Sequence, residues 1–445
     1  MGASTHQANR DELILHSSLT DPCLNTMTFL NDIASQYPEA ISFAPGRPIE
    51  KDFKFGDISF YINIYIDHLM KNEHRLESGV ITQLFQYGPS EGYIRALIAD
   101  MLNITDGITC SPEDIVVTSG AQEGMLLILR ALFSDSDDVL LVPQPVYVGI
   151  IGAARLLDIR IETFDIHEHG VEISEIKEKI QATEAEGGKV KALYINADFC
   201  NPIGISLPLN QRKELVKLAR NYNLTLLEDN PYGIFGSERS INPTLISLDL
   251  HNNHVAYLGS FSKTLFPGVR VGFIVSRRLS LALTKIKSML TLNTSPIGQA
   301  IVGGVLLECQ GDLRHHCKTK INFYLNNLDD LLNQLDASFP EGSHLRSQIS
   351  WNRPKGGFFL VLRLPFPVNL SLLKISAEQH GVLWTPMEIF YSPPRESNEI
   401  RLSFSYLTPE ELKEGVIRLS DFIKECMAIN TPKAFNKQSK GDEYK

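Results

Sequence analysis

Short apolar runs alternate with longer amphipathic segments between residues 114 and 275 of the 445-residue chain. The short runs are rich in β-branched residues, which favour strands, whereas the longer segments repeat apolar residues at helical spacing. The pattern predicts seven strands, at Ile115–Thr118, Val139–Val142, Ile159–Phe164, Val190–Ile195, Leu224–Leu227, Val255–Leu258 and Val271–Val275. It predicts helices between them at Gln122–Phe133, Val146–Leu156, Ile173–Thr183 and Gln211–Asn221.

This alternation is typical of βαβ units, and near-continuous apolar strands favour a mostly parallel sheet that is covered on both faces. The predicted fold class is therefore α/β, with a large domain at residues 46–330. Helices at 281–335 and then mixed short strands and helices predict a smaller α+β domain at residues 331–430. We expect residues 1–45 to form an N-terminal arm and the polar, lysine-rich residues 431–445 to be a disordered tail.

The charge balance argues against a nucleic-acid-binding protein, because 42 Lys and Arg face 52 Asp and Glu, a formal net charge of −10. No apolar run reaches the roughly 18 residues of a membrane helix. Acidic residues near the N-terminus argue against a secretory or transit peptide. The six cysteines are scattered without a C-x-x-C pair, which favours a reducing compartment. We expect a cytoplasmic protein.

Parallel sheets bind ligands at the carboxyl ends of their strands, so polar residues that follow strands are candidates for a site. Lys263 lies in the run Gly259–Gly272, close to Ser260, Ser262 and Arg270. Burial and a neighbouring cation lower the pKa of an amine, which makes Lys263 a candidate Schiff-base lysine. The hydroxyls and the guanidinium suit a phosphate. The alternative is a turn with a solvated lysine.

Thr118–Gln122 also follows a strand and opens a helix, so the backbone N–H groups of Gly120, Ala121 and Gln122 could cradle an anion. A simple tight turn is the alternative.

Four other polar or aromatic side chains follow predicted strands. Asp229 is a strand-end carboxylate that could pair with a protonated pyridine nitrogen, and Tyr232 could donate to a phenolic oxygen. The amide of Asn201, held by a Pro-Gly turn, could bind the same oxygen, and Tyr147 could stack on a flat ring. Taken singly, a helix cap, an ordinary turn and core packing would explain these residues equally well.

Together these groups match one ligand, pyridoxal 5′-phosphate, which has a phosphate, an aldehyde, a phenolic oxygen and a pyridine nitrogen. The run Gly-Ser-Phe-Ser-Lys-x-x-x-Pro-Gly-x-Arg-x-Gly resembles that of the class I and II aminotransferases, fold-type I pyridoxal-phosphate enzymes. It is most similar to the branch with 2-aminoadipate, kynurenine and aromatic aminotransferases. The resemblance implies that Lys263 binds the cofactor aldehyde and acts as the general base. It implies that Asp229, Tyr232, Asn201 and Tyr147 hold the ring, and that the phosphate is bound by Ala121, Gln122, Ser260, Ser262 and Arg270.

The resemblance extends to three further positions. Arg401, in Asn398–Phe404, is similar to the arginine that binds the substrate α-carboxylate, and Gly46 to a glycine that lines the substrate side of the pocket. Tyr87 resembles the tyrosine that reaches the phosphate of the neighbouring subunit, which implies an obligatory homodimer. The alternatives are a surface position for Arg401 and ordinary turns at Gly46 and Tyr87. Ala121 stands where relatives often have serine, and Ile203 where they have threonine.

The implied reaction is ping-pong transfer of an amino group from an L-amino acid of 2-aminoadipate, aromatic or long-chain type to 2-oxoglutarate. A lyase or cyclopropane-carboxylate-type synthase of the same fold is the main alternative. A cofactor-binding regulatory domain is a weaker one, because the stretch before Met27 is too short for a DNA-binding domain. No metal site is predicted, since the Cys309–Cys317 cluster matches no zinc spacing. Phe358 and Phe359 fit either an apolar substrate pocket or a core strand.

Overall fold

The computed structural model describes residues 15–21, 24, 32–51, 53–238, 242–250 and 253–430. The predicted tail at 431–445 and most of the predicted N-terminal arm therefore lie outside the described residues. The described part of the arm includes strand β1 (Ile41–Ser42), which pairs in parallel with β12 (Val382–Leu383). This pairing joins the start of the chain to its C-terminal third.

The large sheet has the strand order β2-β9-β8-β7-β6-β3-β4-β5. Neighbours from β8 to β4 are parallel, and β9 runs antiparallel to both β2 and β8. The seven predicted strands are present, and the eighth is a two-residue strand, β5, too short to give a sequence pattern. The bounds are β2 Ile115–Thr118, β3 Asp138–Gln144, β4 Arg160–His167, β5 Gly170–Val171, β6 Lys189–Ile195, β7 Thr225–Asp229, β8 Val255–Ser260 and β9 Gly272–Val275.

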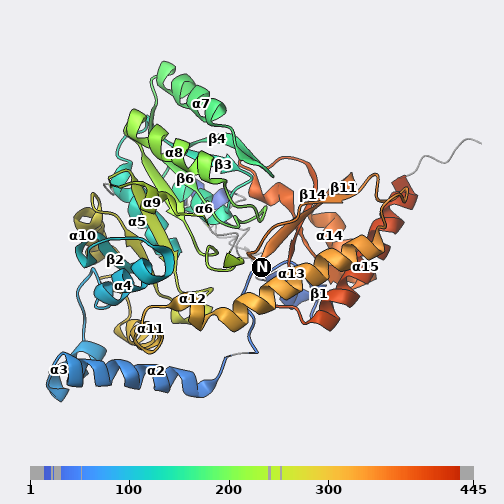
Figure 1. Ribbon diagram of the computed structural model, residues 1–445. Helices are drawn as coiled ribbons and strands as arrows, with labels where there is room; N and C mark the ends of the chain where they lie inside the picture. Colours follow the sequence, from blue (N-terminus) through green and yellow to red (C-terminus); the bar gives the residue numbers. More distant parts are fainter. Residues whose placement is uncertain are drawn as a thin grey trace, which may run out of the picture.

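Helices cover both faces of this sheet (Figure 1). Successive residues of a strand enter different cores: Val139 and Leu141 of β3 lie in one, and Leu140 and Val142 in the other. This is the side-chain alternation of a doubly covered sheet, and it confirms the α/β class. The helices of this part are α2 Phe55–Asp67, α3 Glu77–Phe85, α4 Arg95–Asp106, α5 Ala121–Leu132, α6 Val148–Leu156, α7 Ile173–Ala185, α8 Leu209–Tyr222, α9 Leu245–Leu248, α10 Ser280–Leu290, α11 Pro296–Glu308 and α12 Leu313–His316.

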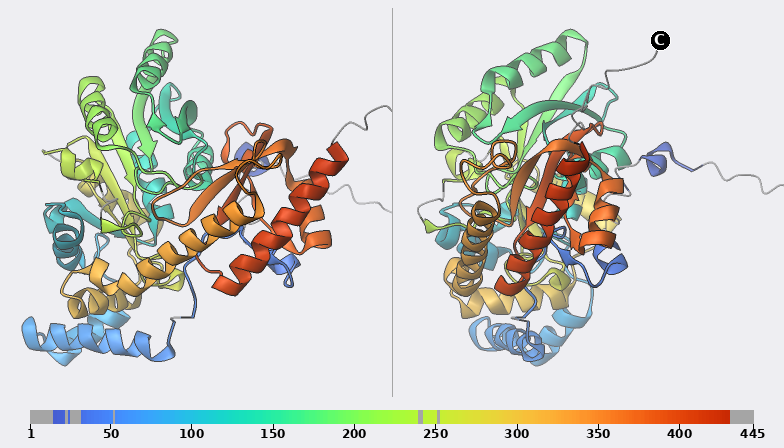
Figure 2. Two further views of the ribbon diagram at one scale, coloured as in Figure 1. Left: turned by 45° about the vertical axis from the view of Figure 1, so that its right-hand side comes forward. Right: turned by 90° about the vertical axis from the view of Figure 1, so that its right-hand side faces the viewer.

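A smaller α+β unit follows, with a sheet of order β10-β11-β14-β13 and a separate core. The long helix α13 runs between the two units and packs against α15 (Figures 1 and 2). None of the helices in the described ranges combines the length and apolar character needed to cross a bilayer. The bounds are α13 Lys318–Ser338, β10 Ser350–Trp351, β11 Phe359–Val368, α14 Leu370–His380, β13 Thr385–Pro386, β14 Ser397–Ser403 and α15 Pro409–Asn430.

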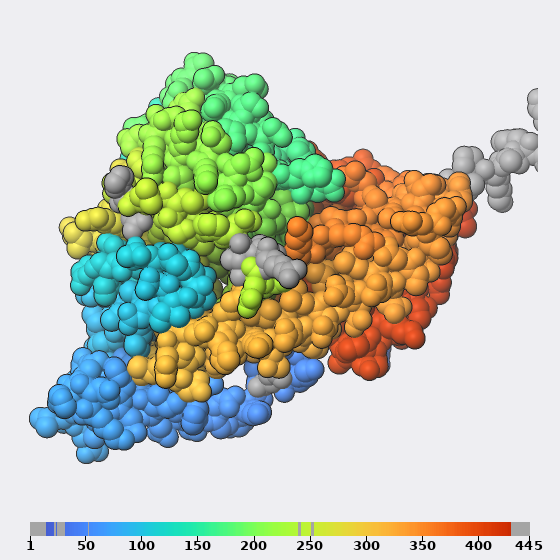
Figure 3. Space-filling view, in the orientation of Figure 1, coloured from blue at the N-terminus to red at the C-terminus, as the bar shows by residue number. Residues whose placement is uncertain are grey.

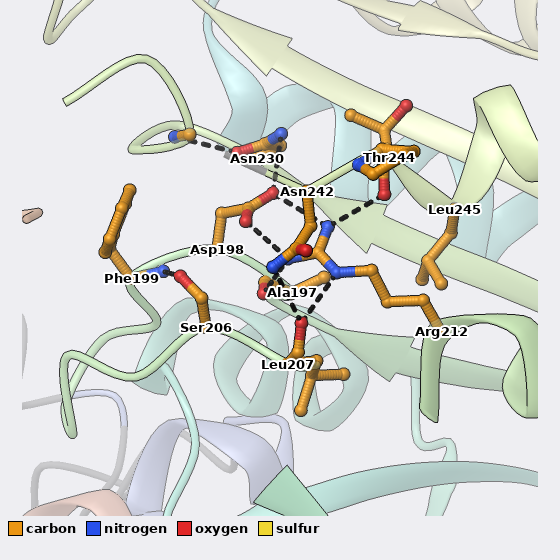
Figure 4. Close-up of polar contacts among 12 residues, drawn as sticks. Ala197, Asp198, Phe199, Ser206, Leu207, Arg212, Asn230, Asn242, Thr244 and Leu245 are labelled. Atoms are coloured by element: carbon orange, nitrogen blue, oxygen red, sulfur yellow. Dashed lines mark hydrogen bonds and ion pairs between the residues drawn. The ribbon is translucent and has the colours of Figure 1, made fainter. Parts of the chain in front are cut away.

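A buried ion pair anchors the loops that follow β6 and β7 (Figure 4). Arg212 of α8 is fully buried and pairs with Asp198, and it donates to the carbonyls of Ala197 (2.8 Å) and Leu207 (2.9 Å). Asp198 in turn lies 3.5 Å from the amide nitrogen of Asn230, beside Asp229. The pair thus joins the two loops that carry Asn201 and Asp229.

We expect Arg212→Met to lower the free energy of unfolding by about 3–5 kcal/mol, because it leaves the Asp198 charge buried and unpaired. Urea unfolding followed by circular dichroism measures the change. Lys213→Met, on the exposed side of the same helix, is the matched control and should change stability little. A loss below about 1 kcal/mol for Arg212→Met would show that the pair does not anchor these loops.

Candidate active site

Lys263 lies in the loop between β8 and β9 and is partly buried. Its Nζ donates a hydrogen bond to the carbonyl of Gly46, at 2.7 Å. Burial, together with the charges of Arg401 and Arg270, lowers the pKa of Lys263 to about 8. A substantial fraction of this amine is therefore neutral near physiological pH, as a nucleophile requires.

Arg270 lies against the loop that opens α5. Its Nη2 donates to the carbonyl of Ser119 (3.1 Å), and its Nη1 lies 3.5 Å from Oγ of Ser262. Gly120 has φ +83°, and a Cβ there would lie 2.7 Å from Nη2 of Arg270, so this approach requires glycine. No side chain caps the N-terminus of α5. Its first amides and the exposed guanidinium therefore face the same space, where an anion can bind.

Asp229 ends β7 and is 2% exposed. Oδ2 accepts a hydrogen bond from the hydroxyl of Tyr194 (2.6 Å), while Oδ1 has no partner among the described residues. Burial raises the pKa of Asp229 to about 6, against the effect of the Tyr194 hydrogen bond. A buried carboxylate oxygen without a donor is costly, and a cationic ligand group would relieve that cost.

Arg401 of β14 is 2% exposed and reaches across from the small unit. It donates to Oδ1 of Asn201 (2.7 Å) and to the carbonyl of Ala44 (2.6 Å), while its Nε has no described partner. Its Cζ lies 4.4 Å from the centre of the Phe359 ring and 4.8 Å from that of Phe390. Burial lowers the pKa of Arg401 to about 10, so it remains charged at neutral pH.

Aromatic rings surround the space between these groups. Burial raises the pKa of Tyr232, which is hydrogen-bonded to Asn201, and raises that of Tyr147 to about 12, so both keep their protons at neutral pH. The Phe359 ring packs edge-on against Tyr232 and lies so close to Gly46 that a Cβ there would collide with it. Phe358 also packs against Tyr232, with ring centroids 5.2 Å apart, and its other ring contacts are with Phe235 and Tyr324 in the core.

Three cations, Lys263, Arg270 and Arg401, thus meet without a compensating acid. Their hydrogen-bond acceptors are neutral oxygens, and none of the three forms an ion pair with a carboxylate of the described residues. Their charges also act on one another, since Arg401 and Arg270 both lower the pKa of Lys263. Such an arrangement attracts anionic ligands.

Most of the predicted site residues therefore lie in one region. Gln122 joins it by donating from Nε2 to the carbonyl of Gly149 (3.1 Å), beside Tyr147, and Ser260 Oγ accepts from the Ser262 amide (3.2 Å). Tyr87 differs: it is 79% exposed, and within the described part of the chain it forms no hydrogen bond with these residues.

The sequence interpretation missed Tyr194, Ala44, Thr385 and Phe390. Tyr194 lies in a largely apolar strand, and only its hydroxyl group could have indicated a polar contact. Ala44 contributes a backbone carbonyl, which no side-chain pattern can indicate. Thr385 and Phe390 meet Arg401 only through the folding of the small unit.

The fold and this site define a pyridoxal-phosphate-dependent transferase. A model of the family "Aminotransferase class I and II" matches residues 57–419, and the chain belongs to this family. It is therefore a pyridoxal-phosphate-dependent aminotransferase, and the predicted family is confirmed.

Two curated relatives and one solved structure illustrate the similarity. The (S)-3,5-dihydroxyphenylglycine transaminase of Amycolatopsis orientalis is 43% identical over 92% of this chain and 93% of its own. Aromatic-amino-acid aminotransferase 1 of Thermococcus litoralis is 32% identical over 78% and 81%. The crystal structure of a kynurenine aminotransferase from Pyrococcus horikoshii superposes with a TM-score of 0.81 and 27% identity, covering 94% of this chain and 99% of that one.

The residues present fit the cofactor. The partnerless Oδ1 of Asp229 suits a protonated ring nitrogen, and the uncapped end of α5 with Arg270 suits a phosphate. Lys263 lies in the same region as these two groups. The pKa of its amine is lowered, and condensation with an aldehyde requires a neutral amine.

In the cofactor-free protein, we expect Asp229→Asn to increase stability at pH 8 by about 3 kcal/mol. The folded-state pKa of about 6 lies above the ordinary 3.8. The wild-type protein therefore loses stability as pH rises between these values, and the asparagine variant does not. The advantage of the variant should shrink as pH falls from 7 to 5. Urea unfolding of both apoproteins across this range measures it.

Addition of pyridoxal phosphate should reverse the order, because a ring cation would pair with the Asp229 carboxylate and not with asparagine. A wild-type apoprotein that is the more stable of the two at pH 8 would contradict the proposed burial cost.

Proposed function

We propose that this aminotransferase moves the amino group of an aromatic L-amino acid to 2-oxoglutarate by a ping-pong reaction. The observation that carries the proposal is Arg401, a buried guanidinium that lies close to two phenyl rings and has no acidic partner among the described residues. A planar fork of donors binds a carboxylate bidentately, and amino-acid and 2-oxo-acid substrates share that group.

The contacts also support a role for each site residue. We assign Lys263 to the cofactor aldehyde and Asp229 to the ring nitrogen, with Tyr194 as its support. Tyr232 and Asn201 are assigned to the ring oxygen, and Tyr147 to the ring face. The phosphate is assigned to the amides of Ala121 and Gln122 and to the side chains of Ser260, Ser262 and Arg270.

When bound, pyridoxal phosphate supplies the electron sink that stabilises negative charge at Cα and carries the amino group between the half-reactions. With the cofactor bound, Lys263 would act as the general base that takes the proton from the substrate Cα and later returns it. Arg401 orients the substrate by its carboxylate, so that the Cα–H bond faces the Lys263 amine. Gly46 accepts a hydrogen bond from that amine, and only glycine fits there because a Cβ would collide with the Phe359 ring.

The surroundings of the site favour an aromatic donor within the predicted range of 2-aminoadipate, aromatic and long-chain amino acids. Phe359 and Phe390 lie against Arg401, and Tyr232 packs against Phe359. Tyr147, whose pKa Arg401 affects, lies in the same region. A substrate held by Arg401 would therefore lie among aromatic rings. The names of the two relatives point the same way, since one acts on a dihydroxyphenylglycine and the other on aromatic amino acids. Ring-to-ring contacts would favour these donors over aliphatic ones.

We further propose that the enzyme is a homodimer whose site includes Tyr87 of the partner subunit. Tyr87 and the exposed Phe85, Leu292 and Ile297 line a hollow of about 510 Å³. The adjoining α2–α3 segment forms one corner of the molecule (Figure 3) and exposes further apolar side chains, among them Phe55. An apolar surface of this kind, next to an exposed tyrosine, suits a second copy of the chain.

A panel of amino donors with 2-oxoglutarate tests the substrate assignment. We expect phenylalanine, tyrosine and hydroxyphenylglycines to give the highest kcat/KM for glutamate formation, with parallel double-reciprocal plots. Highest activity with alanine or aspartate would contradict the aromatic assignment, and no glutamate with any donor would contradict the acceptor.

Arg401→Gln is the variant that tests carboxylate binding in this assay. It should lower kcat/KM for donor and acceptor by roughly 100-fold, because a buried charged contact is lost. Decarboxylated donors such as tyramine, which lack the carboxylate, should be affected little.

Subunit complementation tests the placement of Tyr87. Tyr87→Phe should weaken pyridoxal phosphate binding by roughly tenfold, because one hydrogen bond to a charged group is lost. Co-expression with the inactive Lys263→Ala chain should restore one tight site per heterodimer, since the Lys263→Ala chain supplies Tyr87 to the other. If Tyr87 serves its own chain, the heterodimer will stay weak.

A further inference from the structure

A buried lysine–glutamate pair lies behind the loop Thr118–Gln122 and takes no part in the proposed chemistry. Lys287 of α10 is 0% exposed, and its Nζ donates to both carboxylate oxygens of Glu123 at 2.9 Å. Thr291 completes the cluster: its hydroxyl accepts from Lys287 (3.0 Å) and donates to Glu123 (2.6 Å). The two charges are thus fully satisfied by one another and by this hydroxyl.

The pair is connected to the site through the backbone of Ser119. Oε2 of Glu123 accepts from the Ser119 amide (2.5 Å), and the Ser119 carbonyl accepts from Nη2 of Arg270 (3.1 Å). Glu123 therefore holds one side of Ser119 and Arg270 the other. The hydroxyl of Thr118 fixes the following carbonyl, of Gly120 (2.9 Å).

The negative charge of Glu123 lies close to the proposed phosphate site. Glu123 lies in the first turn of α5, whose amides face the anion site. A carboxylate so close to a phosphate would repel it unless its charge were neutralised. Lys287 neutralises the Glu123 carboxylate, and burial keeps water from screening the attraction between the two charges.

We infer that Lys287 and Glu123 are positioning residues for the cofactor phosphate. Their neutral pair holds the 118–122 loop in the conformation that presents its amides and Arg270 to the phosphate. This inference rests on the proposed placement of the phosphate at this loop.

Titration of the apoprotein with pyridoxal phosphate, and with pyridoxal, which lacks the phosphate, tests the inference. Absorbance of the lysine-bound aldehyde reports both dissociation constants. We expect Lys287→Met to raise the constant for pyridoxal phosphate by about tenfold or more and that for pyridoxal by less than about twofold. Lys285→Met, on an exposed position of the same helix, is the matched control and should change neither.

The two Glu123 variants separate positioning from a general loss of structure. Glu123→Gln keeps an acceptor for the Ser119 amide and removes the negative charge, so it should bind pyridoxal phosphate at least as tightly as the wild type. The double variant Lys287→Met/Glu123→Gln should recover most of the affinity lost in Lys287→Met. If Lys287→Met does not fold, Lys287→Gln takes its place, because its amide can still donate to Glu123. A selective loss of pyridoxal phosphate affinity then supports the inference, and unchanged affinity or equal losses for both aldehydes overturn it.

Three results would overturn the inference: unchanged pyridoxal phosphate affinity in Lys287→Met, equal losses for both aldehydes, or no recovery in the double variant. The variant Arg270→Gln shows whether such a result refutes only the positioning role of Lys287 and Glu123 or the phosphate site as well. A selective loss of pyridoxal phosphate affinity in Arg270→Gln would leave the site intact and only the positioning role refuted. Equal losses for both aldehydes there would refute the site.

Discussion

The active site depends on a concentration of positive charge that the described part of the chain leaves without acidic partners. Lys263, Arg270 and Arg401 converge, and neutral oxygens, chiefly backbone carbonyls and an asparagine amide, hold their donors in place. Carbonyl acceptors orient a guanidinium without neutralising it. The cations therefore stay available to a phosphate and a carboxylate, and they lower the pKa of the lysine between them.

The acidic groups of the site region are separated from these cations by their own partners. Asp198 is paired with Arg212, and Glu123 with Lys287, so each charge is satisfied within the fold. Asp229 is the exception, because one of its oxygens has no described partner and burial raises its pKa. The structure thus leaves one buried carboxylate oxygen unpaired, at a cost in stability of the cofactor-free protein, and this is the group that we assign to the cationic ring.

The two units contribute different parts of the site, which makes their relative placement decisive. The large unit supplies Lys263, Asp229 and Arg270 from loops at the strand ends, and the small unit supplies Arg401. The segment that contains Ala44 and Gly46 contacts both, since Ala44 accepts from Arg401 and Gly46 from Lys263. A short stretch of backbone thereby connects Arg401 to Lys263, the residues to which we assign the substrate carboxylate and the cofactor aldehyde.

The order of strands and helices, and the residues directly after the strands, could be predicted from the sequence, because periodicity and turn residues act over short stretches of chain. Lys263, Asp229, Asn201 and Arg401 were identified in this way or from their motifs. Strand β5 was too short to predict, and the contacts of Ala44, Tyr194 and Lys287 could not be predicted. These contacts join residues far apart in sequence, such as Lys287 with Glu123 or Arg401 with Ala44. Only tertiary packing brings such groups together, and it also decides which charges are paired and which remain free for a ligand.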